Sequence, residues 1–142
     1  QEGEVRVASF NMSSQDVETF MTKPWVVTSS DGTNGHPRKY ASFAKKYQEY
    51  VVNKQLLTTA EFINRSSANT ANILGLKGRG VITKGAFADI IVFDRKAFKA
   101  NADFSRWNVL SSGIEQVLVN GELVIENTKY TNKLAGQFLS KN

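Results

Sequence analysis

The feature that most restricts the fold is a change of residue pattern near residue 77. Before it, apolar residues recur mostly at helical spacing between helix start and stop signals; after Gly78 the chain is rich in glycine and β-branched residues. The dipeptide Asn120-Gly121 lies between the apolar runs VLV and ELVI. It predicts a tight hairpin, because both residues tolerate a positive φ. We therefore expect an α/β chain in two parts, residues 1–77 and residues 78–142, of which the second is β-rich.

Capping and stop signals predict three helices in the first part. Ser13 can cap a helix that ends before Lys23-Pro24, since proline disfavours helix in the residue before it. The pattern Thr58-x-x-Glu61 is a capping box, and the helical character that follows it ends at Gly75. A further helix is expected over residues 42–52, with three apolar residues on one face: Phe43, Tyr47 and Val51.

Two segments of the first part predict β-strands. Val5–Phe10 (VRVASF) partly alternates between apolar and polar residues, and Trp25–Thr28 (WVVT) is aromatic or β-branched on both faces, as in a buried strand. With the helix expected between them, they predict one βαβ unit of parallel strands. Residues 97–112 contain Trp107 but show no clear period, and we expect a loop there.

Asp31 directly follows the apolar run Trp25–Ser30 (WVVTSS). In parallel α/β folds, sites form outside the carboxyl ends of the strands, and a carboxylate there can ligate a metal, orient a water or act as a general base. Gly32 and Gly35 would let the following loop turn sharply. An Asp-Gly turn without chemistry is the alternative, and the spacing does not decide between them.

His36 is the single histidine of the chain. A zinc site needs three or four protein ligands, so a chain with one histidine and no cysteine cannot supply a histidine-rich metal site alone. The glycine-rich stretch at residues 75–80 (GLKGRG) matches neither phosphate-binding loop pattern, and we interpret it as the junction between the two parts.

Charge and composition limit the partners. The net charge of +5 comes from scattered basic residues, whereas nucleic-acid binding usually clusters them on one face, so we expect no nucleic-acid partner. No apolar run approaches the roughly 20 residues that span a bilayer, and we expect no membrane partner. The lack of cysteine leaves the compartment open; we expect the cytoplasm.

Several segments share a pattern with known enzymes. They are PWV followed by SSDG, the HPR loop, the run GLKGRGVITKGAFADIIVFD and the hairpin VLVNGELV. From about residue 5 to its end, the chain resembles the C-terminal part of the amidohydrolase superfamily. The last two segments are common across that superfamily. The first two resemble the D-aminoacylases (N-acyl-D-amino-acid deacylases) in particular.

The resemblance implies a (β/α)8 barrel beside a small β domain. Val5–Phe10 would be the seventh barrel strand, Trp25–Ser30 the eighth, and residues 78–142 the C-terminal strands of the β domain. Asp31 would take a proton from a zinc-activated water as the water attacks the amide of an N-acyl amino acid. It would then pass the proton to the departing amine, and it is also a possible metal ligand.

The HPR loop supplies the remaining candidate substrate-binding residues. The resemblance places His36 and Arg38 near the barrel mouth, where the guanidinium could pair with a substrate carboxylate. Arg38 could equally brace the loop by pairing with Asp31 or with backbone carbonyls. Ser30 and Gly32 would shape the pocket wall.

The resemblance also implies that most of the family's metal ligands have no counterpart in this chain. The chain would then be the C-terminal third or less of such an enzyme, with the remainder of the barrel as its partner. Alone it would bind no zinc and hydrolyse nothing. The alternative is a non-catalytic binding or scaffolding module derived from an amidohydrolase.

Overall fold

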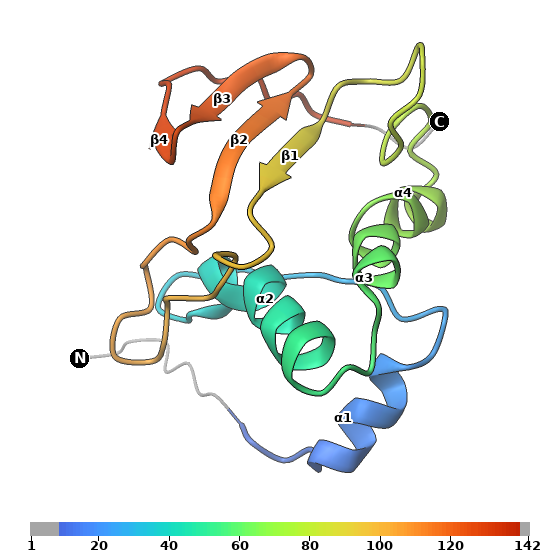
Figure 1. Cartoon of the computed structure of the whole chain (residues 1–142), viewed down its shortest axis with the longest axis vertical. Coiled ribbons are helices and arrows are strands. Elements are labelled where there is room, and N and C mark those ends of the chain that lie inside the picture. Colours follow the sequence, from blue (N-terminus) through green and yellow to red (C-terminus); the bar gives the residue numbers. More distant parts are fainter. Residues whose placement is uncertain (1–8, 140–142) are drawn as a thin grey trace, which may run out of the picture.

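A computed structural model describes residues 9–139, in which all helices precede all strands (Figure 1). The sheet is antiparallel, with the strand order β1-β2-β3-β4. In Figure 1 it occupies the upper part of the molecule, with the helices below it and to its right. The elements in chain order are α1 (Ser14–Met21), α2 (Arg38–Lys46), the π-helix η1 (Tyr47–Asn53), α3 (Thr59–Ser66), α4 (Ala68–Leu74), β1 (Ile90–Phe93), β2 (Ile114–Val119), β3 (Glu122–Glu126) and β4 (Lys129–Tyr130).

The helix start and stop signals are confirmed. The Ser13 hydroxyl accepts the backbone N–H of Asp16 at the start of α1. At the start of α3, the Thr58 hydroxyl accepts the N–H of Glu61, whose carboxylate accepts the N–H of Thr58. Gly75 ends α4 in the left-handed conformation with φ 71°.

The helix expected over residues 42–52 begins earlier and changes type. It starts at Arg38, because Pro37 holds φ at −63° and is preorganised for a first helical turn. From Tyr47 to Asn53 it continues as a π-helix. Tyr47 is buried and Val51 packs against the core, whereas Phe43 is 39% exposed and does not join that core.

The strand predicted at Trp25–Thr28 is not present, which corrects that expectation. The backbone N–H of Val26 bonds Lys23 O in a turn, and that of Thr28 bonds Arg65 O at the end of α3; Trp25 is exposed. β-branched residues favour a strand only where a neighbouring strand pairs with them, and no parallel pair exists within residues 9–139. Most of the other predicted strand, Val5–Phe10, lies outside the described residues; Ser9 and Phe10 are not in a strand.

The hairpin at Asn120-Gly121 is confirmed. Both residues have positive φ, 50° and 84°, and they join β2 to β3. The expected loop at residues 97–112 is also present, closed by one pair of backbone hydrogen bonds between Lys99 and Ser112.

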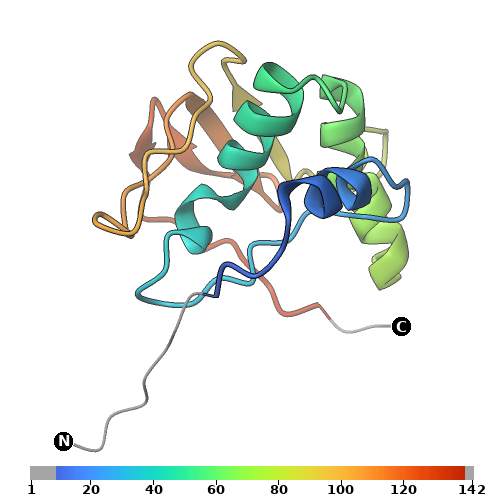
Figure 2. The ribbon, with the colours of Figure 1, turned by 90° about the horizontal axis from the view of Figure 1, so that it is seen from below.

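The core lies between the helices and the start of the sheet. Tyr47 packs its ring edge against Phe62 at 5.2 Å and lies 5.5 Å from the Phe98 ring, between ring centroids. Phe93, at the end of β1, packs against the same cluster. Viewed from below in Figure 2, the helices lie in front of the sheet, and this core fills the layer between them. The helical and β-rich segments therefore share one hydrophobic core.

Candidate functional site

The loop that follows Trp25–Ser30 folds back onto the start of α2. Asp31 adopts the left-handed conformation, with φ 44°, and so turns the chain after Ser30. A side chain at Gly32 would lie 3.1 Å from Lys39 Cγ and 3.3 Å from Lys39 Cα, so the absence of a Cβ permits this close approach. The Lys39 ammonium donates to Asn34 Oδ1 at 3.0 Å. These contacts fix the loop at the N-terminus of α2.

Arg38 joins the two ends of this loop. Its guanidinium lies 2.9 Å from the Asp31 carboxylate and donates to the Thr33 hydroxyl at 3.2 Å. The Nε atom of Arg38 is buried and has no hydrogen-bond partner among the described residues. The structure therefore contains the loop-bracing contacts that the sequence allowed, while one donor of the guanidinium remains unused.

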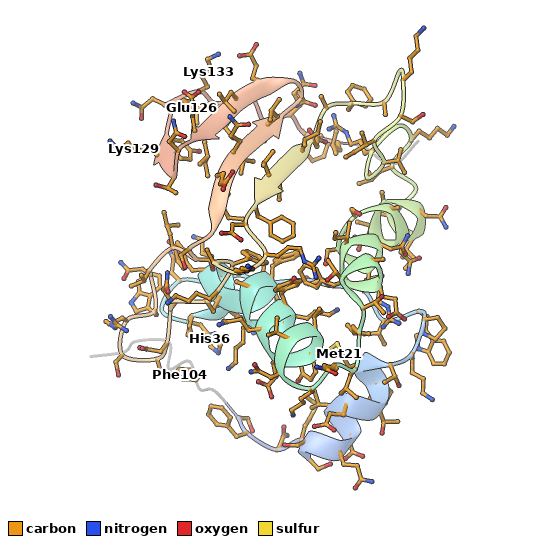
Figure 3. All side chains as sticks on the ribbon, viewed as in Figure 1. Met21, His36, Phe104, Glu126, Lys129 and Lys133 are labelled. Carbon is orange, nitrogen blue, oxygen red and sulfur yellow. The ribbon has the colours of Figure 1, made fainter. Side chains whose placement is uncertain are left out.

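His36 is held in place by its own loop and by an aromatic ring. Its Nδ1 atom accepts the backbone N–H of Arg38 at 3.1 Å, so the neutral ring carries its proton on Nε2. The ring packs edge-to-face against Phe104, 5.1 Å between centroids. Figure 3 shows the two side chains together on the same flank of the molecule.

An open groove of about 1210 Å³ lies beside this loop. Of the predicted site residues, Arg38 and His36 line it, whereas Asp31, Ser30 and Gly32 do not. Arg38 is therefore the link between the Asp31 carboxylate and the groove. The other walls come from Phe10 before α1, from Thr33 in the same loop, and from α2, η1 and the loop at residues 97–112, including Lys45, Glu49, Asp103 and Phe104.

The two carboxylates of the groove stay ionised. Hydrogen bonds from the Lys54 ammonium and the Asn53 amide lower the pKa of Glu49. The pKa of Asp103 is lowered by the backbone N–H groups of Arg106 and Ser105, which donate to its carboxylate. Arg38 and Lys45 lie in the same groove, so it presents both signs of charge.

The residues present do not form a complete metal site. Within residues 9–139, no three His, Cys, Asp or Glu side chains gather closely enough to hold a metal ion. Asp31, the one predicted ligand, is paired with Arg38, a cation that would compete with a metal. A metal would need most of its ligands from outside the described residues.

The sequence did not indicate that Phe10 and Phe104 belong to this region. Phe104 lies in a loop without periodicity, far along the chain from His36, and only packing brings the two rings together. In the sequence, Phe104 is only an aromatic residue among polar neighbours, and such residues are too common to single out a site.

Comparison with known proteins gives a consistent family. Residues 6–125 match the amidohydrolase family. An N-acyl-D-glutamate deacylase from Alcaligenes xylosoxydans xylosoxydans is 34% identical over 116 residues, which are 79% of this chain and 24% of that protein. No helix within the described residues is long and apolar enough to cross a membrane.

Two solved structures are similar to this one. A crystal structure of D-aminoacylase matches with a TM-score of 0.84 at 29% identity, over 88% of this chain and 27% of that one. The N-acyl-D-glutamate deacylase of Bordetella bronchiseptica, complexed with zinc and a phosphonate inhibitor, matches with a TM-score of 0.76 at 33% identity, over 80% and 25%. The chain spans about a quarter of the length of these relatives. With the match over most of its length, this chain belongs to the amidohydrolase family.

Proposed function

We propose that this chain is the C-terminal part of an enzyme that hydrolyses the amide bond of N-acyl-D-amino acids. Residues 1–77 would contribute the last helices of a (β/α)8 barrel and the segments that become its last strands where the remainder of the barrel pairs with them, and residues 78–142 the C-terminal strands of its small β domain. The deacylase names of its relatives and its coverage of about a quarter of their length support this proposal.

The observation that carries the proposal is the position of Asp31. Its carboxylate directly follows Trp25–Ser30, is 81% exposed and is held 2.9 Å from the Arg38 guanidinium. An accessible carboxylate can take a proton from an attacking water. It can then return that proton to the amine nitrogen as the C–N bond breaks.

Arg38 has a second role in this proposal. The carboxylate of an N-acyl amino acid would replace Asp31 as the partner of the Arg38 guanidinium. It would also accept a hydrogen bond from the unused Nε donor. His36 would position Arg38 through the bond from the Arg38 N–H to Nδ1. Ser30 and Gly32 would shape the loop that carries Asp31.

The proposal includes a metal because a relative binds one. The Bordetella enzyme is complexed with zinc, and the complete enzyme would use zinc to activate the attacking water. This chain would contribute at most Asp31 to that site, so alone it would be inactive. The remainder of the barrel would be its partner.

The second candidate is a non-catalytic binding or scaffolding module. The Asp31–Arg38 ion pair favours this second candidate. The Asp31 carboxylate already has a cationic partner in its own loop, so the loop is stable without a substrate. The two candidates differ in whether Asp31 is needed for turnover.

The test is Asp31→Asn in the complete protein, assayed with a panel of N-acyl-D-amino acids. The amide keeps the size of the carboxylate but cannot take a proton, so we expect kcat to fall by about 10³-fold. Asp16→Asn in the exposed first turn of α1 is the matched control and should keep at least half of the activity. Full activity in Asp31→Asn would favour the module.

A further inference from the structure

The loop at residues 97–112 comes from the β-rich segment but lies against the HPR loop of the helical segment. Its Phe104 ring packs edge-to-face against both His36, at 5.1 Å, and Phe10, at 5.6 Å between ring centroids. The three rings form an aromatic wall along one side of the groove. In Figure 3, Phe104 and His36 lie close together below the sheet.

This loop is fixed to α2 near one end and to η1 near the other. The Ser111 hydroxyl donates to Tyr40 O at 2.7 Å, and the Ala100 N–H donates to Gln48 Oε1 at 2.9 Å. Gly113 closes the loop with φ 83°, where a Cβ would lie 2.4 Å from Phe98 N. A larger residue there would displace the loop. The wall is therefore held at a set distance from the start of α2.

The turn that carries Phe104 is also ordered by its own hydrogen bonds. The Asp103 carboxylate accepts the N–H groups of Ser105 and Arg106 at 2.9 and 2.7 Å. These bonds present Phe104 to the groove with more than half of its surface still exposed, at 56%. An ordered aromatic ring with a free face is a suitable surface for an apolar group of a ligand.

The wall lies next to the groups that would bind the reacting part of a substrate. Arg38 lines the same groove and contacts Asp31, and His36 connects Arg38 to Phe104. In an amino acid, the side chain branches from the carbon that bears the carboxylate, whereas the acyl group lies beyond the amide. A carboxylate on Arg38 would therefore bring the side chain, rather than the acyl group, toward Phe104.

We propose that Phe104 is a specificity-determining residue that receives the apolar side chain of the D-amino acid. This inference rests on the proposed function and adds to it a preference for substrates with large apolar side chains. It assigns a role in recognition to the β-rich segment, through one loop.

The test compares Phe104→Ala with the wild type in the complete enzyme. For N-acetyl-D-phenylalanine, we expect kcat/KM to fall by at least about 10-fold, mainly through KM, because an apolar contact is lost. For N-acetyl-D-alanine, which is too small to reach the ring, the change should stay below about 3-fold. Phe104→Leu keeps an apolar side chain and should lie between the two. Should Phe104→Ala fail to fold, Phe104→Leu carries the same comparison.

Leu110→Ala is the control within the same loop, since Leu110 is exposed and does not line the groove. An equal loss on both substrates would show that Phe104 only supports the loop, and unchanged selectivity would show that no side chain reaches it. A change of selectivity between N-acetyl and N-butyryl-D-alanine would place the acyl group on the wall instead. Each of these outcomes overturns this inference and leaves the proposed function intact. A wild type that hydrolyses no N-acyl-D-amino acid overturns the proposed function itself.

Discussion

Among the arginine–aspartate pairs within residues 9–139, two differ clearly in burial. At the candidate site, the Arg38 and Asp31 side chains are 36% and 81% exposed. At the junction between helices and sheet, the Arg79 and Asp89 side chains are 10% and 33% exposed. The same chemical pair is thus open to solvent in one place and largely closed to it in the other.

The junction pair is part of a satisfied network. Arg79 also donates to Asn120 Oδ1 at 2.7 Å and stacks 4.2 Å from the Phe87 ring, and Asp89 accepts the N–H of Asn120 at 2.8 Å. It therefore ties the GLKGRG stretch to the hairpin turn. At the candidate site, Asp31 is exposed and Arg38 keeps an unused donor. The comparison shows that burial and shared hydrogen bonds make an ion pair structural, while exposure leaves its carboxylate available for chemistry.

The largest effect on stability is expected from Arg79→Met. It removes the guanidinium that pairs with Asp89 and donates to Asn120 Oδ1, and the free energy of unfolding should fall by about 3 kcal/mol. Urea unfolding followed by circular dichroism measures the change. The control is Lys133→Met, which removes an exposed pair with Glu122 and should cost less than about 1 kcal/mol. Equal effects of the two variants would contradict the distinction between buried and exposed pairs.

Lys46 extends the comparison, because it is a buried cation with no ion-pair partner among the described residues. Its ammonium donates to the Thr28 hydroxyl at 2.9 Å. Burial, and then the charge of Arg65, lower the pKa of Lys46 from 10.5 to about 8. The unfolded chain therefore binds more protons than the folded chain between about pH 8 and 10.5, so this residue makes stability rise with pH there.

We expect a rise of about 2 kcal/mol between pH 8 and pH 10 relative to Lys46→Met, which lacks the titrating group. The measurement is the free energy of unfolding of both proteins at each pH. In Lys46→Met, Thr28 keeps its hydrogen bond to the Ser66 hydroxyl, so the substitution leaves no unpaired hydroxyl. Parallel pH profiles for the two proteins would show that Lys46 has an ordinary pKa when folded.

The smallest effect on stability is expected from Arg38→Met. Because the pair with Asp31 is exposed, the free energy of unfolding should change by less than about 1 kcal/mol. KM for N-acyl-D-amino acids should rise at least about 10-fold if Arg38 binds the substrate carboxylate. The KM of Arg38→Lys should lie between those of the wild type and Arg38→Met, since lysine keeps the charge without the planar fork. A large loss of stability with an unchanged KM would instead make this pair structural, like that of Arg79.

Features set by neighbouring residues could be predicted from the sequence. The Ser13 cap, the Thr58–Glu61 capping box, the Gly75 helix end and the Asn120-Gly121 turn each depend on contacts within a few residues. Their chemistry is complete in the local chain, so no tertiary contact is needed to specify them. The membership of the amidohydrolase family was likewise predictable from short motifs.

The errors arose where a feature depends on a distant partner. Trp25–Thr28 has strand propensity, but no strand lies beside it within the described residues. Phe43 has helical spacing with Tyr47, yet it is 39% exposed and does not join the cluster that Tyr47 forms with Phe62 and Phe98. Propensity specifies what a segment can form, and packing decides whether it does.

For the candidate site, the sequence by itself determined that Asp31 directly follows Trp25–Ser30 and that His36 and Arg38 come soon after it, in the HPR motif. Only the tertiary structure decided that Arg38 pairs with Asp31, that the groove lies beside Arg38 and His36, and that Phe104 completes its aromatic wall. The physical reason is the range of the interactions. Backbone caps and turns act between near neighbours, whereas these contacts form only once a shared core holds the helical and β-rich segments together.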